Sequence, residues 1–391
     1  MTTNSAAREA FTAWCHDELF SEELIRATAL MQEALDWHLL DIFKRLDLGA
    51  FLTDFTSPAD LAANLGYVDS AAITMDAMLE RLAAKYDFVE KDDSEDALRF
   101  RQVAPAPDAP RDLGKIRQQA AELNEEYLVT LEFLEFGNEK FEYSLKDDPE
   151  FLDRILSGRE PEFADLWFRA TNVDPLQNVH GIMGAVAIDM LFERGDILEI
   201  GGGTGNGIRN LFQHLSKKSD LSRVERYLFT DISQKFIMST RREIRTDYPD
   251  VQTDWRFADL NVPLQEQKIE PGSVDLIYAV NAAHVAKDIV GFLRSCKETL
   301  RPGGRVLFAE RIRLTARDMA PRELALNLSI YHRTAAIRNN AYRPMHCYLS
   351  PDNWLKVFAE AGFSDGDIWP NIGAMEDRFP DQYAAIVTAV A

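Results

Sequence analysis

One segment, ILEIGGGTGNG at residues 197–207, constrains the fold of this chain more than any other. Its apolar beginning predicts a β-strand, glycines occupy five of the last seven positions, and helical periodicity comes next. Glycine adopts a positive φ without strain and lets a ligand approach the backbone closely. A strand, a glycine-rich loop and a helix in this order are typical of nucleotide-binding α/β domains. The segment therefore predicts an α/β fold with a ligand held at the glycine loop.

The spacing of these glycines distinguishes between two kinds of nucleotide site. The dinucleotide pattern G-x-G-x-x-G fits in no register, because its third glycine would fall on Asn206 or Ile208. A NAD-dependent dehydrogenase is therefore disfavoured. The pattern that does fit is E-x-G-x-G-x-G, which comprises Glu199, Gly201, Gly203 and Gly205.

Composition and charge narrow the class of protein. The 391 residues suggest two or three domains, and a hydrophobic fraction of 46% indicates a globular chain. A formal net charge of -21 would repel phosphate backbones, so we expect no nucleic-acid partner. Three scattered cysteines favour neither a disulfide framework nor a zinc cluster, and we expect no metal site. The N-terminus lacks the pattern of a signal peptide and no apolar run is long enough to span a bilayer, so we expect a cytoplasmic protein without membrane contact.

The first 110 residues have the outline of a winged helix. Residues 22–46 carry apolar residues at helical spacing, Ser57 and Pro58 open a short helix, and a second helix follows at 70–85. The segment FVEKDDSEDALRF then predicts two short strands around an acidic turn. DNA binding is disfavoured, because the second helix offers only two cations at its C-terminal end and the wing is acidic. We therefore interpret residues 1–110 as a winged-helix-like dimerisation domain.

Two further regions complete the expected domain organisation. After a proline-rich linker, residues 111–194 are expected to form a helical connector that supplies substrate-pocket helices. Residues 195–391 alternate strands and helices, which predicts a Rossmann-like, mostly parallel sheet of seven strands. The long stretch at 313–345 interrupts this alternation, and we interpret it as a functional lid. The expected strands are 196–201, 226–231, 255–260, 274–280, 305–310, 366–370 and 383–390.

Candidate binding residues follow from the rule that ligands of an open parallel sheet lie at the carboxyl ends of its strands. The second expected strand ends at Asp231, whose carboxylate can accept both ribose hydroxyls of a nucleoside or help to cap the next helix. The third ends at Asp259 and Leu260, which are placed to bond an adenine amino group and to pack against its ring. Asn281 follows the fourth strand and completes this set.

His284 is the leading candidate for catalysis. It follows the fourth expected strand in the centre of the sheet, and Glu310 closes the adjacent strand. Histidine titrates near neutral pH and suits a general base, and a carboxylate beside it can fix its tautomer. A buried structural histidine is the alternative interpretation. His332 in the lid and His346 just after it are weaker candidates.

The segments that carry these residues resemble known methyltransferases. The E-x-G-x-G-x-G spacing resembles motif I of class I S-adenosylmethionine-dependent methyltransferases. Between residues 195 and 310, the chain is similar to the C-methyltransferase domain of polyketide synthases in DILEIGGGTGNG, RYLFTDIS, FADLN, VDLIYAVNAAHVAKDI and LRPGGRVLFAE. This resemblance implies S-adenosylmethionine as the cofactor. It also implies a dyad of His284 and Glu310 that deprotonates the α-carbon of a β-ketoacyl thioester.

The N-terminal part resembles a second family. Residues 20–110 are similar to the winged-helix dimerisation region of small-molecule O-methyltransferases, in which a histidine at the position of His284 is the base for a hydroxyl. The H-D-W motif of that family is absent, because Val285 and Ala286 follow His284. The methyl acceptor therefore stays open between an activated carbon, which we favour, and the oxygen of a hydroxyl or carboxyl group.

These observations together predict a homodimeric methyltransferase of secondary metabolism. Its acceptor is expected to be a small molecule, either free or bound to a carrier protein. The non-enzymatic alternative is a winged-helix regulator that senses a metabolite, and the acidic net charge disfavours it.

Overall fold

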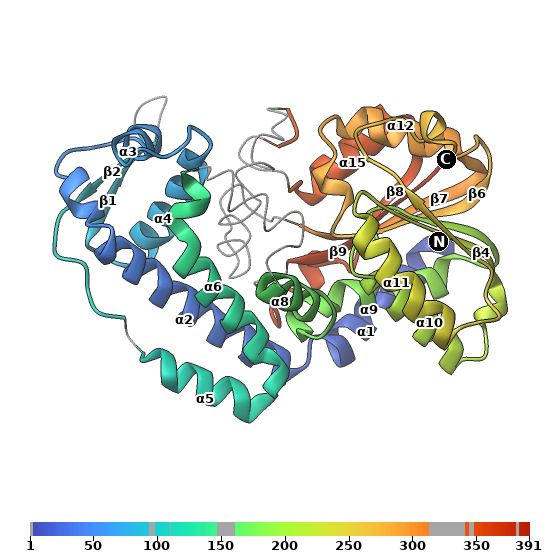
Figure 1. Cartoon of the computed structure of the whole chain (residues 1–391), viewed down its shortest axis with the longest axis horizontal. Helices are drawn as coiled ribbons and strands as arrows, with labels where there is room; N and C mark the ends of the chain where they lie inside the picture. Colours follow the sequence, from blue (N-terminus) through green and yellow to red (C-terminus); the bar gives the residue numbers. More distant parts are fainter. Residues whose placement is uncertain are drawn as a thin grey trace. The chain divides into compact units, whose positions relative to one another are not determined.

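The computed structural model describes residues 3–93, 98–109, 111–146, 161–312, 341–343, 348–380 and 383–391. Its elements fall into two units, which are described separately (Figure 1). The sheet unit comprises 1–21, 177–314 and 339–391, and the helical unit comprises 22–176 and 315–338. The first 21 residues thus belong with the sheet and not with the segment that follows them in the sequence.

A seven-stranded sheet forms the centre of the sheet unit, in the order β5-β4-β3-β6-β7-β9-β8. The first five strands of this order are parallel, and β9 pairs antiparallel with both β7 and β8. The expected Rossmann-like α/β class is therefore confirmed. The strands are β3 (Gly195–Glu199), β4 (Val224–Asp231), β5 (Thr253–Phe257), β6 (Val274–Val280), β7 (Leu300–Arg311), β8 (Ser364–Trp369) and β9 (Ala384–Val390).

Helices cover both faces of this sheet, as expected for a parallel sheet whose strands are apolar on both sides. Figure 1 shows α9, α10 and α11 on one face and α12 and α15 on the other. On the first face, Phe212 of α10 packs edge-on against Tyr227 of β4, with 5.2 Å between ring centroids. On the second, Trp354 of α15 packs against Phe308 of β7 at 6.2 Å. The helices are α9 (Pro175–Leu191), α10 (Asn206–Lys217), α11 (Gln234–Asp247), α12 (Ile289–Thr299) and α15 (Pro351–Glu360).

The N-terminal segment forms a helix that the sequence analysis did not identify. α1 (Thr3–Trp14) continues into a π-helical turn and packs against the edge strand β8. Arg8 bonds Asp367 at 2.9 Å, and the rings of Phe11 and Trp369 lie 5.5 Å apart. The first of these pairs joins residues 359 positions apart, so no local pattern predicts it.

The helical unit contains the elements expected from its sequence pattern, in the expected order. Ser57 caps α3, because its hydroxyl accepts a hydrogen bond from the backbone N–H of Asp60 at 3.1 Å. β1 and β2 form an antiparallel pair after α4. The interpretation as a winged-helix dimerisation domain stays a prediction. The elements are α2 (Glu22–Arg45), α3 (Pro58–Asn64), α4 (Ala71–Lys85), β1 (Val89–Asp92), β2 (Arg99–Gln102), α5 (Leu113–Leu123), α6 (Leu128–Leu145) and α8 (Pro161–Asn172).

The two cations at the end of α4 are bound within the helical unit. Arg81 donates to one carboxylate oxygen of Asp36 at 2.6 Å, and Lys85 donates to the other. Asp36 lies on α2 and is buried, and a buried carboxylate requires such partners. Both cations therefore join α4 to α2.

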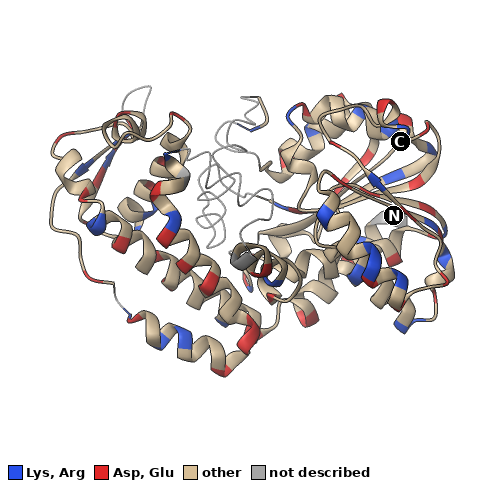
Figure 2. Ribbon diagram, in the orientation of Figure 1, with Lys and Arg blue, Asp and Glu red and all other residues tan. Residues whose placement is uncertain are grey.

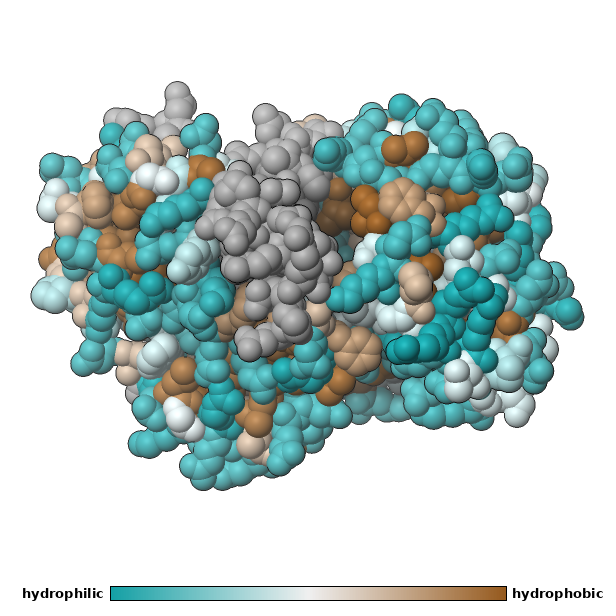
Figure 3. Space-filling model, viewed as in Figure 1, coloured by the Kyte–Doolittle hydropathy of each residue, from teal (hydrophilic) through white to brown (hydrophobic). Residues whose placement is uncertain are grey.

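Charged side chains dominate the surface over α10 and α11. Figure 2 shows lysines and arginines gathered there, and Figure 3 shows that the same surface is largely hydrophilic. Arg209 of α10 pairs with Glu243 of α11. Among the residues that the structure describes, no helix is both long and apolar enough to cross a membrane. The expected lid at 313–345 lies outside the described residues except for 341–343, and His332 and His346 lie outside them as well.

Candidate active site

The glycine loop connects β3 to α10 and leaves one open position. Gly201, Gly203 and Gly205 all have positive φ, at 61°, 53° and 87°. A Cβ added at Gly201 would lie 2.6 Å from the Cβ of Ala282, so this position is closed by protein atoms. Within the described part of the chain, a Cβ added at Gly203 would meet a single atom within 4 Å, the carbonyl oxygen of Gly201 at 4.0 Å. Gly203 therefore lines open space where a ligand can contact the backbone.

Glu199 lies beneath this loop. Its side chain has no exposed surface, and the hydroxyl of Tyr227 donates to it at 2.8 Å. A Cβ at Gly207 would collide with the same carboxyl group. Burial raises the pKa of Glu199 to about 8, so the group is protonated at neutral pH. In this position Glu199 supports the loop and the start of α10 from below.

Asp231 connects the end of β4 to the glycine loop. One carboxylate oxygen accepts the backbone N–H of Gly203 at 2.8 Å, and the other accepts that of Ser233 at 2.7 Å. The cap of α11 is Ser233, whose hydroxyl accepts the N–H of Phe236 at 3.4 Å. A carboxylate has about four lone-pair sites, so acceptor capacity remains for a ligand's hydroxyl group. Burial raises the pKa of Asp231, while the backbone N–H groups act in the opposite direction.

The other predicted binding residues follow their strands at the same edge of the sheet. β5 ends at Phe257, so Asp259 and Leu260 lie just beyond it and not within it as expected. Asp259 accepts two bonds from Asn261, both at 2.9 Å, and Leu260 is half-buried against the core. Asn281 adopts a φ of 48°, and its side-chain oxygen accepts the N–H of the residue after Glu310 at 2.7 Å.

Two exposed apolar side chains near Asp231 were not identified from the sequence. Ile232 follows Asp231 directly and is 59% exposed. Phe257 is paired with Asp231 across β4 and β5 and is 50% exposed. Exposure of an apolar side chain at a strand end would have identified both residues. The sequence pattern could not show this exposure, because exposure depends on the register of the sheet.

The two predicted catalytic residues are in direct contact. His284 Nδ1 and Glu310 Oε2 lie 2.6 Å apart, at the ends of the neighbouring parallel strands β6 and β7. The other carboxylate oxygen of Glu310 accepts the backbone N–H groups of Ala282 at 3.1 Å and Ala283 at 2.8 Å. Glu310 is fully buried and His284 is 5% exposed. An acceptor at Nδ1 places the ring proton there, so Nε2 carries the lone pair that a general base requires.

Aromatic and cationic side chains that the sequence analysis missed surround this dyad. The ring of Tyr348 lies 4.5 Å from that of His284, with an interplanar angle of 40°. The guanidinium of Arg311 lies 5.8 Å from the Tyr348 ring and 4.9 Å from that of Tyr383. Only Arg311 had a local signal, its position directly after Glu310. The two tyrosines reach the site through long-range packing.

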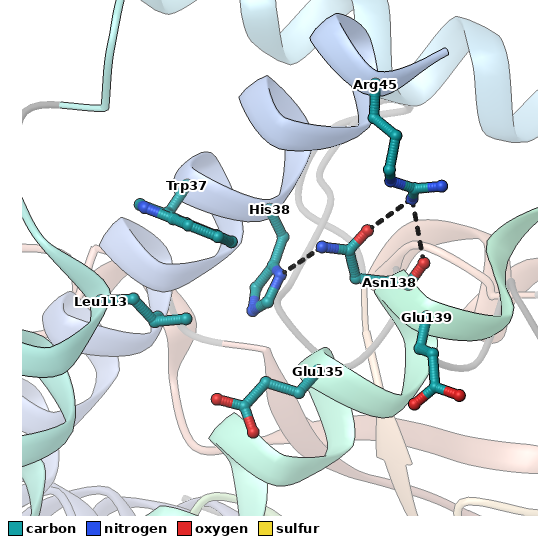
Figure 4. Close-up of a pocket in the computed structure, with 7 residues that line it drawn as sticks. All are labelled: Trp37, His38, Arg45, Leu113, Glu135, Asn138 and Glu139. Carbon is teal, nitrogen blue, oxygen red and sulfur yellow. Dashed lines mark hydrogen bonds between the residues drawn. The ribbon is translucent and has the colours of Figure 1, made fainter.

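The helical unit contains a cavity of about 410 Å³ with a different kind of histidine (Figure 4). Asn138 donates to His38 Nδ1 at 3.0 Å and to Asp41 at 2.9 Å, and its oxygen accepts from Arg45 at 2.8 Å. Burial lowers the pKa of His38 to about 4, so its ring is neutral at pH 7. This histidine joins α2 to α6, and we assign it no catalytic part. The cavity is lined by Trp37, His38, Arg45, Leu113, Glu135, Asn138 and Glu139.

Metal ligands are not grouped in the described ranges. No cluster of three or more His, Cys, Asp or Glu side chains that could hold a metal ion occurs among them. The residues that converge at the sheet edge are instead a glycine loop, one acidic side chain bonded to it, and a histidine–glutamate pair.

Comparison with known proteins agrees with this arrangement. Residues 198–306 match the family described as Methyltransferase domain. Over 172 residues the chain is 28% identical to a highly reducing polyketide synthase of Pyrenophora dematioidea, a match that covers 44% of this chain and only 6% of that protein. The predicted resemblance to polyketide synthases is therefore confirmed.

Solved structures extend the similarity of fold to the whole chain. The CurJ carbon methyltransferase has a TM-score of 0.75 at 19% identity and covers 99% of this chain and 96% of its own. The trans-methyltransferase CalH, solved in complex with SAH, has a TM-score of 0.55 at 18% identity, over 92% of this chain and 90% of its own. The chain therefore has the fold of these methyltransferases, and residues 198–306 within it match the methyltransferase domain family.

Proposed function

We propose that this chain transfers a methyl group from S-adenosylmethionine to an activated carbon of a small acceptor, such as the α-carbon of a β-ketoacyl thioester. The observation that carries the proposal is the buried pair of His284 and Glu310 beside the glycine loop. Gly201 of that loop touches Ala282, two residues before the histidine. The polyketide synthase relative and the carbon methyltransferase fold support carbon as the acceptor.

The residues at the sheet edge suit this cofactor. Gly203 leaves open backbone for the amino-acid part, and Asp231 keeps acceptor capacity for a ribose hydroxyl. The exposed side chains of Ile232 and Phe257, together with Leu260, are suited to pack against the adenine ring. When bound, S-adenosylmethionine supplies a methyl group on a positively charged sulfur.

Further contacts are assigned to the remaining predicted residues. Gly205 directly precedes α10 as its N-cap, and we propose that it lets the backbone stay close to the cofactor. Asp259 is proposed to bond the adenine amino group. Asn281 is proposed to lie beside the cofactor through its backbone, because its side chain bonds the backbone of β7. Glu199 acts from beneath the loop, where its protonated carboxyl avoids placing a charge in the core.

The dyad supplies the base that carbon methylation requires. Nε2 of His284 takes the proton from the α-carbon, and the electron pair of the broken C–H bond becomes the enolate. With S-adenosylmethionine held by Gly203 and Asp231, the methyl group would pass to this carbon, and the electron pair of the broken S–CH₃ bond would stay on sulfur. Glu310 holds the ring in the required tautomer and stabilises the imidazolium that forms. Because the proposed base and the glycine loop lie close together, the acceptor and the methyl group would be held near each other. Such positioning supplies much of the acceleration of displacement reactions.

The experiment follows the labelled methyl group. The protein is incubated with S-adenosylmethionine carrying a ¹³C methyl and with the N-acetylcysteamine thioester of acetoacetate, and the product is examined by ¹³C NMR. A carbon-bound methyl, absent with the His284→Ala variant, supports the proposal. An oxygen-bound methyl overturns it in favour of the O-methyltransferase alternative. A folded protein that binds no S-adenosylhomocysteine in calorimetry overturns the cofactor assignment itself.

Assembly and delivery of the acceptor are part of the same proposal. We propose that the chain is a homodimer and that, of the predicted dimerisation domain at 1–110, residues 22–110 carry this role, because residues 1–21 belong to the sheet unit. Of the predicted connector at 111–194, residues 177–194 likewise belong to the unit that contains most of the predicted methyltransferase domain at 195–391. The acceptor is proposed to arrive free or on a carrier protein. Comparing the thioester with the same acyl group on an acyl carrier protein, under equal conditions, separates the two modes of delivery.

A further inference from the structure

The loop that carries His284 has backbone carbonyl groups that do not take part in helix or sheet hydrogen bonds. It leaves β6 and forms a single 3-10 turn that contains His284. The helix α12 then begins at Ile289, five residues after His284. Buried carbonyl groups of this kind require hydrogen-bond donors from elsewhere. One side chain supplies them: Arg343 donates to the carbonyl oxygens of His284 at 3.0 Å, Ala286 at 2.8 Å and Lys287 at 2.9 Å.

Arginine is suited to this task and lysine is not. A guanidinium presents five N–H donors in one plane, so a single side chain can bond several carbonyl groups at fixed angles. Here Nη1 bonds two of the carbonyls and Nη2 bonds the third. The side chain of Arg343 has no exposed surface, so these bonds are made in a water-poor environment where they constrain the backbone strongly.

Arg343 is itself attached to the core of the sheet unit. The carbonyl oxygen of the preceding residue, Tyr342, accepts a hydrogen bond from the side chain of Asn353 at 2.8 Å, and the Tyr342 hydroxyl bonds Glu360. Asn353 and Glu360 both belong to α15. The contacts therefore run from α15 through Tyr342 and Arg343 to the backbone of the His284 loop.

We infer that Arg343 is a positioning residue for His284, an inference that rests on the proposed role of His284 as general base. The imidazole is fixed from three sides. Glu310 bonds Nδ1, Tyr348 covers a face of the ring, and Arg343 holds the backbone from which the ring projects. Without Arg343 the loop carbonyls lose their donors, and the short bond between His284 and Glu310 loses its fixed geometry.

The test uses a readout that does not depend on the acceptor. In protein labelled with ¹⁵N-histidine, the Nδ1 proton shared with Glu310 gives a far-downfield resonance, which His284→Gln identifies among the seven histidines. We expect Arg343→Met to make this proton exchange with water at least about tenfold faster, a change of about 1.4 kcal/mol in the opening equilibrium. Its affinity for S-adenosylhomocysteine should stay within about threefold of the parent.

A matched control is available on the strand that carries Glu310. Arg305 is a partly buried arginine of β7 that bonds Thr388 at 3.2 Å and not the His284 loop. Arg305→Met should leave the exchange rate of the Nδ1 proton unchanged. Equal exchange rates in Arg343→Met and the parent overturn the inference, and so does equal acceleration by both variants, which would indicate general loosening of the unit.

A second variant covers the case in which Arg343→Met does not fold. Arg343→Lys keeps the positive charge but offers one ammonium group, which cannot bond three carbonyl groups in the same geometry. It should show accelerated exchange, and parent-like exchange overturns the inference. The outcome is separable from the proposed function, because a protein that transfers no methyl group to carbon still reports the His284–Glu310 bond in this experiment.

Discussion

Replacing Gly203 by alanine tests the glycine loop at a position where an added Cβ fits the folded protein but would collide with the proposed ligand. The added Cβ meets no protein atom closer than 4.0 Å, so the folded protein has room for it. The φ of 53° costs about 1–2 kcal/mol for a residue with a Cβ. We therefore expect the melting temperature to fall by about 2–4 °C per kcal/mol, which leaves the protein folded.

Cofactor binding should respond to the same change more strongly. The methyl group occupies the space that we assign to S-adenosylmethionine, and forcing an extra methyl into a packed site costs about 1–3 kcal/mol. This corresponds to roughly 5- to 150-fold weaker binding of S-adenosylhomocysteine in isothermal titration. The loss comes on top of any effect on stability, because it is measured on folded protein.

Gly272 provides the matched control for this experiment. Its φ is 59°, and a Cβ there would meet no described atom within 4 Å, whereas a Cβ at Gly203 would meet one at 4.0 Å. It precedes β6, at the edge of the sheet opposite to the glycine loop. Gly272→Ala should cost similar stability and leave the affinity unchanged. The reasoning fails if both variants bind S-adenosylhomocysteine like the parent, or if both weaken it equally.

Other variants address the remaining parts of the site. His284→Ala should leave S-adenosylhomocysteine affinity nearly intact and lower turnover by about 10²–10⁴-fold; a variant with near-parental turnover would make His284 structural. Glu310→Gln should be almost as damaging, because its oxygen is needed by two backbone N–H groups and its NH₂ would then face Nδ1 and favour the wrong tautomer; stopped-flow turnover close to the parent's would contradict this. Asp231→Ala should weaken S-adenosylhomocysteine binding by about 1.5–3 kcal/mol, and a change below threefold would refute the ribose assignment. Since burial raises the pKa of Asp231, the affinity of the parent should fall on acidification at a higher pH than for an ordinary aspartate. The free energy of unfolding should decrease as pH rises between about 4.5 and 8, by up to about 1.4 kcal/mol per pH unit from Glu199 alone, because the folded state keeps a proton that the unfolded state has released. Glu199→Gln should remove this contribution to the slope in urea titrations. An unchanged slope would show that Glu199 is ionised when buried. Light scattering at micromolar concentration should give a dimer, and a monomer mass of 44.4 kDa would contradict the proposed assembly.

The parts of the site that could be predicted from sequence are those fixed by strand ends. In a parallel sheet, every strand delivers its last residues to the same edge, so Asp231, His284 and Glu310 could be placed together once the strands were identified. The apolar runs and the glycine loop identified those strands. The contact of His284 with Glu310 then followed from the adjacency of β6 and β7.

The parts that could not be predicted depend on contacts between distant segments. Arg343 lies 59 positions after His284, and the residues next to it in the sequence do not indicate that it bonds three carbonyl groups of that loop. The helix α1 was missed for the same reason, since its partner β8 is near the opposite end of the chain. Glu199 was predicted as a cofactor contact from its motif, whereas its burial beneath the loop depends on Tyr227, which belongs to the next strand.

Two glycines of one motif serve different neighbours, and the difference explains how the site is held together. Gly203 faces open space, so its lack of a Cβ matters for a ligand. Gly201 faces Ala282, whose own backbone N–H bonds Glu310 at 3.1 Å. The close approach of Gly201 and Ala282 requires both residues to be small, and it joins the donor loop to the loop that orients the dyad. In the proposed mechanism, the distance between the methyl donor and the base is therefore set by backbone packing, which side-chain motion cannot easily alter.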